Sequence, residues 1–325
     1  SSEEADRQIG LLNSTAQEMG RSTRYSASEA ADALNYLALA GYDADEACAA
    51  LPKVLALAQA GGLDLAYASD LATDAMAALG LSMDELGTFS DQMAVTAQKS
   101  NTSVGQLGEA ILTVGGTAKN LKGGTAELNA ELGILANRGI KGAEGGTHLR
   151  NVILSLTKPT DKAAAQLQAL GVSVYDSSGN MRSMNDIMMD LNRSMDGMTA
   201  EQKQNIISTI FNKTDLAAVT ALLDGCGDEF DELMGYIEDS EGAAQQMADT
   251  MESGLGGSFR TLKSAVEGLA ISFGERLAPM VQKAVEKITS IINWLTSLDD
   301  KTKDTIIKIA AIAAAVGPVL LVGGK

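Results

Sequence analysis

His148 is the only histidine among the 325 residues. Ser-His-Asp catalysis and histidine-rich zinc sites both depend on histidine, and a single one gives weak support to either. The sequence has no Gly-rich loop ending in Gly-Lys-Ser/Thr, no His-Glu-x-x-His and no Cys-x-x-Cys. We therefore predict no catalytic, cofactor-binding or metal-binding residues, no cofactor, and a protein that is not an enzyme.

Acidic residues gather over residues 224–232. A calcium loop needs alternating Asp or Asn side chains, a central glycine and a terminal Glu, and residues 224–228 do not follow that spacing. We interpret the cluster as a solvated acidic face, and Asp176 as a turn residue. A carboxylate pair for sugar hydrolysis stays open, because such pairs form in space rather than in sequence.

The balance of charges narrows the choice of partner. The net charge is −17, whereas phosphate binding needs clustered Lys and Arg, so no nucleic-acid binding is expected. Cys48 and Cys226 lie far apart and could pair, but two cysteines form no dense disulfide framework, which favours folding in a reducing compartment. The polar start at Ser1, without a Met or a signal peptide, indicates a fragment of a longer protein.

Local signals predict a mainly α fold, with a multi-helix bundle or helical hairpins. Aromatic residues make up only 4%, so small aliphatic side chains must form the core. Ser, Asp or Thr followed three residues later by Glu or Gln marks helix starts, and glycines mark helix ends. The predicted starts of this kind are Asp43, Ser82 and Thr199, and Ser26 and Ser28 are candidate caps of the helix before them. Residues 26–61 and 103–139 resemble diverged copies of one helical hairpin, or two hairpins of similar composition.

One segment interrupts the helical pattern. Residues 171–175 alternate between polar and apolar, residues 176–180 read as a turn, and 181–182 would form a short return strand. We predict one small β-hairpin there, followed by a helix capped by Ser183.

Glycines also gather over residues 139–150. We interpret this run as a closely packed turn between two helices, with Thr147 capping the second helix. A ligand-binding loop is the alternative.

The strongest periodicity lies near the end of the chain. Apolar residues over 255–298 follow an a/d spacing, which predicts a long amphipathic helix that Pro279 bends or splits. It is either a core helix of the bundle or an intermolecular coiled coil for self-association. Residues 305–324 form a hydrophobic helix for a membrane or an apolar partner, although Lys308 and Pro318 argue against a permanent anchor.

These signals divide the chain into five parts. They are the end of an upstream helix or linker (1–25), a helical core with the duplicated hairpins (26–160), the β-hairpin with further helices (161–252), the long coiled-coil-like helix (253–300) and the hydrophobic segment (301–325).

The run Gly139-Ile-Lys-Gly-Ala-Glu-Gly-Gly-Thr-His-Leu-Arg150 resembles the Gly-rich signature of phage tail tape measure proteins. Residues 154–159, the hairpin run 171–182 and the order of Leu277-Ala278-Pro279 before a hydrophobic segment are similar to the same family. The likeness covers residues 26–325.

The resemblance implies a structural protein inside the virion tail, which contacts tail tube and tail assembly chaperone proteins and sets tail length. It also implies presence in the host cytoplasm during assembly, and genome delivery through the host envelope with membrane contact by residues 305–324. A membrane-active pore-type protein and a tail-associated cell-wall hydrolase, with its catalytic domain elsewhere, are the alternatives. One continuous helix of 325 residues would reach about 490 Å, so the many glycines predict a folded-back region rather than a full ruler.

Overall fold

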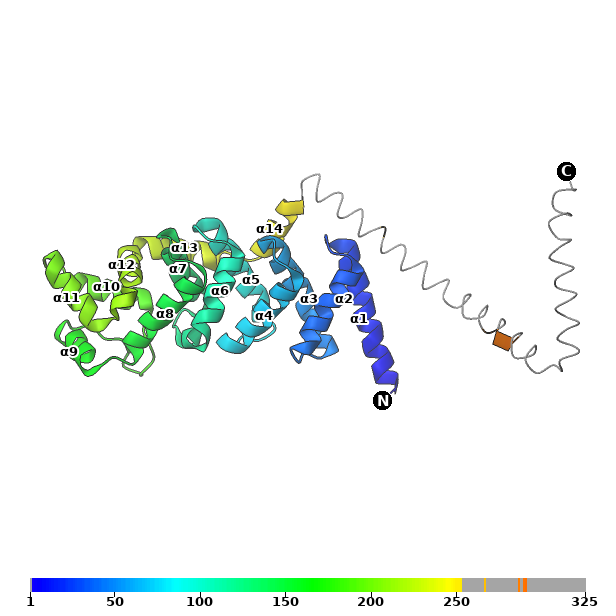
Figure 1. Cartoon of the computed structure of the whole chain (residues 1–325), viewed down its shortest axis with the longest axis horizontal. Coiled ribbons are helices and arrows are strands. Elements are labelled where there is room, and N and C mark those ends of the chain that lie inside the picture. The colour runs from blue at the N-terminus through cyan, green and yellow to red at the C-terminus, as the bar shows by residue number, and fades with distance from the viewer. Residues whose placement is uncertain (1, 253–265, 267–285, 287–288, 291–325) are drawn as a thin grey trace, which may run out of the picture. The chain divides into compact units, whose positions relative to one another are not determined.

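The computed structural model describes residues 2–252 and positions 266, 286, 289 and 290 (Figure 1). Residues 2–252 belong to one compact unit, and we describe that unit by itself. In chain order its α-helices and 3₁₀ helices are α1 (Ser2–Ser22), α2 (Ala27–Leu39), α3 (Ala44–Gly61), α4 (Leu65–Leu79), α5 (Glu85–Lys99), α6 (Val104–Val114), η1 (Gly115–Asn120), α7 (Gly124–Asn137), α8 (Gly142–Thr157), α9 (Asp161–Ala169), α10 (Met184–Ser194), α11 (Ala200–Ile210), η2 (Lys213–Asp215), α12 (Leu216–Gly225), α13 (Asp228–Glu238) and α14 (Ala243–Glu252).

The helices run out along the unit and then return. From α1 to α8 each helix packs on neighbours one or two places away in the chain, and α9 packs on α11 beyond them (Figure 1). The last three helices, which we call the return leg (residues 216–252), run back over the earlier ones. In that leg α12 packs on α10, α8 and α7, α13 packs on α7 and α5, and α14 packs on α5 and α3.

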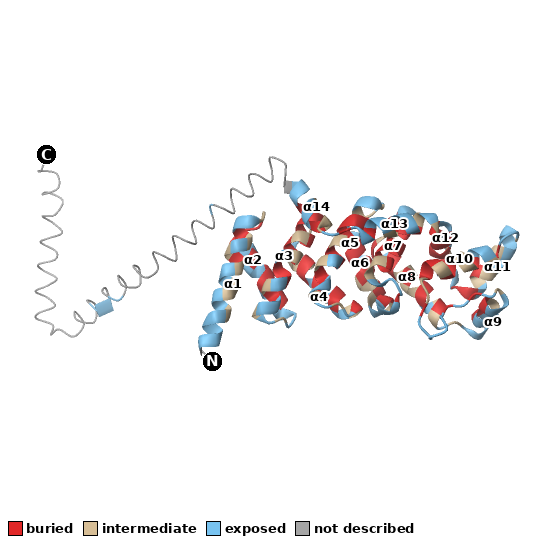
Figure 2. Ribbon diagram, turned by 180° about the vertical axis from the view of Figure 1, so that it is seen from behind, coloured by how far each residue is buried: buried red, intermediate tan, exposed pale blue. Residues whose placement is uncertain are grey.

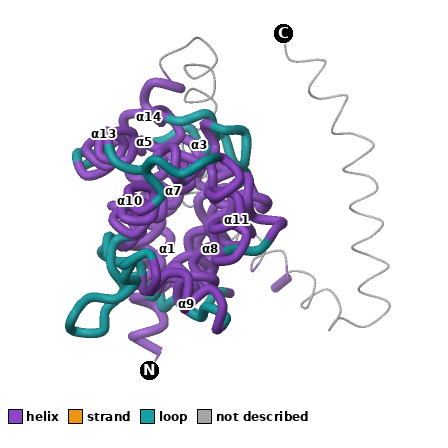
Figure 3. Tube along the Cα trace, turned by 90° about the vertical axis from the view of Figure 1, so that its left-hand side faces the viewer, coloured by secondary structure: helices purple, strands orange, loops and turns teal. Residues whose placement is uncertain are grey.

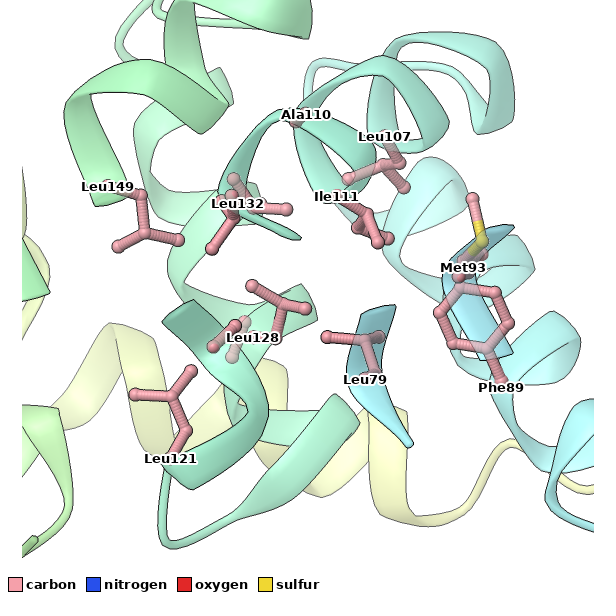
Figure 4. Close-up of a cluster of buried hydrophobic side chains, with 14 of the residues drawn as sticks. Leu79, Phe89, Met93, Leu107, Ala110, Ile111, Leu121, Leu128, Leu132 and Leu149 are labelled. Atoms are coloured by element: carbon pink, nitrogen blue, oxygen red, sulfur yellow. The ribbon is translucent and has the colours of Figure 1, made fainter. Parts of the chain in front are cut away.

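The core lies between the outgoing helices and the return leg. Figure 2 shows buried residues on the facing sides of the helices, with exposed residues on their outer sides. Helix α7 is the most enclosed, because every residue from Glu127 to Ala136 is buried. Leu128 and Leu132 of this helix meet Ile111 of α6 and Leu149 of α8 in one apolar cluster (Figure 4).

The predicted capping boxes at Asp43 and Thr199 are confirmed, and the predicted cap Ser26 also forms a capping box. Ser26, Asp43 and Thr199 each accept a hydrogen bond from the backbone N–H three residues on, and the Glu or Gln at that position bonds back to the cap. Such reciprocal bonds satisfy two N–H groups that the helix leaves without partners. Ser103 caps α6 through the N–H of Gln106.

The prediction that Ser82 caps a helix as a hydrogen-bond acceptor is wrong. Its backbone N–H and hydroxyl both donate to the Glu85 carboxylate, at 2.7 and 2.8 Å, and the helix itself begins at Glu85. Ser82 therefore lies before the helix and acts as a donor rather than as its cap.

The predicted β-hairpin is also wrong, since the described residues contain no strand (Figure 3). A single antiparallel bridge joins Tyr175 to Met181. On one side Val172 already donates its N–H to Leu167 at the end of α9, and on the other side α10 begins directly after Ser183. No residues remain for a longer strand ladder, because the residues before the bridge end α9 and those after it begin α10.

The last two predicted parts of the chain lie outside the described residues, apart from the four isolated positions. They are the amphipathic helix over 253–300, with its self-association, and the hydrophobic segment over 301–325. Among the helices that the structure describes, none combines the length and the apolar character that a bilayer crossing requires. The division into five parts and the duplication of hairpins stay predictions.

Polar side chains from the outgoing helices hold the return leg. Asp91 of α5 accepts hydrogen bonds from the N–H groups of Gly242 and Ala244, both at 2.9 Å, and so caps α14 from another helix. Gln59 of α3 donates to the carbonyl oxygen of Ala248 at 2.8 Å. These contacts join residues more than 150 positions apart in the sequence.

Replacing Asp91 with Ala should therefore loosen α14. Two N–H groups at the start of α14 lose their partner, and loss of a cap costs about 0.5–2 kcal/mol. We expect limited proteolysis to cut residues 240–252 faster in this variant than in the wild type. Asp84→Ala is the matched control, because Asp84 sits at a helix start without a side-chain cap bond. Equal cleavage rates in the two variants would show that Asp91 does not hold the return leg.

Candidate functional site

The Gly-rich run that carries the resemblance is mostly helix. Helix α8 begins at Gly142, so the predicted turn is shorter than expected and Thr147 is not its cap. The Thr147 hydroxyl instead donates to the carbonyl oxygen of Ala143 within the helix, at 2.8 Å. The predicted close packing is real: a Cβ added at Gly146 would collide with the Ala110 carbonyl and lie 2.8 Å from Thr113 Cβ. These glycines therefore let α8 lie directly against α6.

His148 lies on this helix and forms part of a polar lock. Its Nδ1 is 2.7 Å from Oδ1 of Asp215, which is 1% exposed, and its Nε2 is 3.8 Å from Glu144. Asn151 and Asn212 donate to the same Asp215 carboxylate at 3.1 and 3.2 Å. These contacts join α8 to the turn that starts the return leg, and carboxylates face both ring nitrogens of His148.

Glu127 holds two helix starts together. It is 1% exposed. Its carboxylate accepts hydrogen bonds from the N–H of Gly123 (2.7 Å), at the start of its own helix, and from the N–H of Met184 (2.6 Å), at the start of α10. The Ser183 hydroxyl, predicted to cap α10, donates to the same carboxylate at 2.9 Å instead. A negative charge at two helix N-termini is electrostatically favourable.

Glu131 lies one turn further along α7 and has a different environment. Its side chain is buried, and its Oε1 has no hydrogen-bond partner. Burial raises the pKa of Glu131 well above its usual range, and the nearby Glu127 carboxylate raises it further. Glu131 is therefore a carboxyl group that the fold keeps protonated to a higher pH than usual.

The other residues that the sequence analysis considered are dispersed. Within residues 224–232 most acidic side chains are exposed, while Glu229 pairs with Arg138 at 2.8 Å, a hydrogen bond that lowers its pKa. Asp176 is a turn residue as predicted, and accepts hydrogen bonds from the N–H groups of Ser178 and Asn180. Both cysteines are free thiols. Over the described residues, no cluster of three or more His, Cys, Asp or Glu could hold a metal ion.

Sequence reasoning missed the carboxylates that organise the fold. Asp91, Glu127 and Asp215 bond to groups far away in sequence, so no local spacing marks them. For Glu127 a signal did exist, since it sits in a helix that is otherwise rich in apolar residues. An acidic side chain in such a helix needs a buried partner.

Replacing Gly146 with Ala should destabilise the protein. The added methyl group meets the backbone of α6, which cannot move away as a flexible side chain can, and overpacking of this kind costs about 1–3 kcal/mol. Gly235→Ala is the matched control, because that glycine lies in α13 with open space around it. Chemical denaturation should show the control to be about 0.5–1 kcal/mol more stable than the wild type. A stabilising Gly146→Ala change would contradict the close packing.

Replacing Glu131 with Gln should change how stability depends on pH. The folded chain holds the Glu131 proton to a higher pH than the unfolded chain does, so wild-type stability falls as pH rises from about 4.5 through the folded-state pKa. Within that window the Glu131→Gln variant should gain about 1.4 kcal/mol per pH unit relative to the wild type.

Urea unfolding at several pH values measures this difference. Glu144→Gln, at a side chain that is 71% exposed, is the control and should shift stability by no more than about 0.5 kcal/mol. A difference between the Glu131→Gln variant and the wild type that stays constant from about pH 4.5 to pH 8 would exclude a raised pKa.

Comparison with known proteins places the chain in one family. Residues 13–212, which hold the Gly-rich helix and the Glu127 contacts, match the family of phage-related minor tail proteins. A tape measure protein of Pneumococcus phage Dp-1 is 32% identical over 98% of this chain, and a probable tape measure protein of Escherichia phage P2 is 27% identical over 94%. No solved structure matches the chain.

These matches confirm the resemblance to tape measure proteins. The chain spans 28% of the length of the first relative and 38% of the second. It belongs to the family of phage-related minor tail proteins.

Proposed function

We propose that this chain is part of a tape measure protein that takes part in tail assembly and length determination. The observation that carries the proposal is the 32% identity to a tape measure protein over nearly the whole chain. The role is structural rather than enzymatic, inside the virion tail, with assembly in the host cytoplasm. Tail tube and tail assembly chaperone proteins are the proposed partners.

The fold supports a division of labour within such a protein. A ruler needs a length proportional to its number of residues, and a single helix supplies about 1.5 Å per residue. Residues 2–252 instead run out along the unit and return over it, so each residue adds much less length. We therefore assign residues 2–252 to an assembly role, and length measurement to extended helical stretches outside them.

Tail length in a phage that encodes this chain tests the proposal. Removing about four heptads from the predicted amphipathic stretch 255–298 should shorten the tail by about 42 Å, as measured by electron microscopy. The matched control replaces the same heptads with others of equal number, and should restore the original length. Tails of unchanged length after the deletion would rule out the ruler role.

A further inference from the structure

The return leg carries charge of one sign. Residues 216–252 contain ten Asp or Glu residues and no Lys or Arg. Among them, Glu238, Asp239 and Glu241 are exposed around the end of α13, close to Tyr236, which is 42% exposed. Lys99 Nζ lies 4.0 Å from the centre of the Tyr236 ring, so this stretch combines exposed carboxylates with an aromatic ring that one lysine of α5 already contacts.

Two grooves flank the C-terminal half of α8, and we call them the α8 groove pair. One groove, of about 930 Å³, lies between α8, η1 and the turn at residues 175–181. The other, of about 570 Å³, lies between α8 and the end of α11. Leu154 and Lys158 line both grooves and form the ridge between them. Leu154 is 37% exposed, so the ridge offers an apolar surface.

Three lysines give the groove pair a positive charge. Lys122, Lys158 and Lys213 line it and are exposed. Within the described part of the chain they form no ion pair, whereas every one of Arg138, Arg182 and Arg193 pairs with a carboxylate. Lys122 attracts the Asp176 carboxylate without pairing with it. The three lysines are therefore available to acidic groups from outside the unit.

Helices α13 and α14 of the return leg lie at a different edge of the unit from α9. In Figures 1 and 3, α9, which follows the groove-lining end of α8, lies at the lower edge, and α13 and α14 lie at the upper edge. A second copy of the chain can present its α13 end to the groove pair.

We propose that the α8 groove pair binds the acidic return leg of a second copy of this chain, head to tail. The groove lysines meet exposed carboxylates, and Tyr236 of the leg meets the apolar surface at Leu154 and Tyr175. Such a contact uses two different surfaces, so it builds a closed ring or a filament rather than a two-fold dimer. Because the charges are exposed, the contact weakens as salt rises. It is independent of the ruler role.

A charge-swap experiment on the full chain tests this contact by sedimentation at low salt. The groove variant is K122E/K158E/K213E and the leg variant is E238K/D239K/E241K. The matched control is R7E/R21E/R193E, at exposed side chains that line neither groove. We expect the wild type and the control to self-associate, and each of the first two variants alone to weaken association about tenfold or more.

Mixing the groove variant with the leg variant should restore association, because each then offers the charge that the other lacks. Circular dichroism confirms that every variant is folded. Three results would overturn the proposal: a wild type that stays monomeric at low salt, a control that weakens as much as the groove variant, or a mixture that fails to associate.

Discussion

The buried carboxylate of Glu127 is the contact on which the order of the later helices depends. It fixes the start of α7 through Gly123 and the start of α10 through Met184. Asn185, the next residue of α10, in turn accepts the N–H of Gly227 before α13, at 2.9 Å. A hydrogen bond to a charged group contributes about 1.5–3 kcal/mol, and removing one partner leaves the other buried without compensation. The return leg is thus tied to α7 through a short series of helix starts.

Buried or partly buried carboxylates that bond to a distant helix occur elsewhere in the unit as well. Asp91 caps α14 from α5, and Asp215 gathers His148 and two asparagines from α8 and the preceding turn. Helix starts carry N–H groups without partners inside the helix, and a chain of many short helices has many of them. A carboxylate from a distant helix satisfies these N–H groups and at the same time fixes how the two helices pack. The glycines of α8 then allow the close backbone approach that this arrangement requires.

Local sequence patterns predicted the helix starts whose caps lie nearby, such as Ser26 and Thr199. They failed where a local pattern competes with a distant contact. Ser183 has the residue type of a cap but donates to Glu127 instead. Residues 171–182 have the pattern of a hairpin, but their flanks end α9 and begin α10. The Gly-rich run was read as a turn because glycine disfavours helices, whereas here it lies within one that packs against α6. The absence of a catalytic site stays a prediction.

The central claim is that these distant contacts make the outgoing helices and the return leg one cooperative unit. Hydrogen exchange of the full chain in increasing denaturant measures the opening free energy of each helix separately. We expect the amides of α5, α7 and α13 to reach one common opening free energy at denaturant concentrations well below the unfolding midpoint. If α13 instead exchanged through a separate opening of much lower free energy while α5 and α7 stayed protected, the return leg would not belong to the cooperative unit.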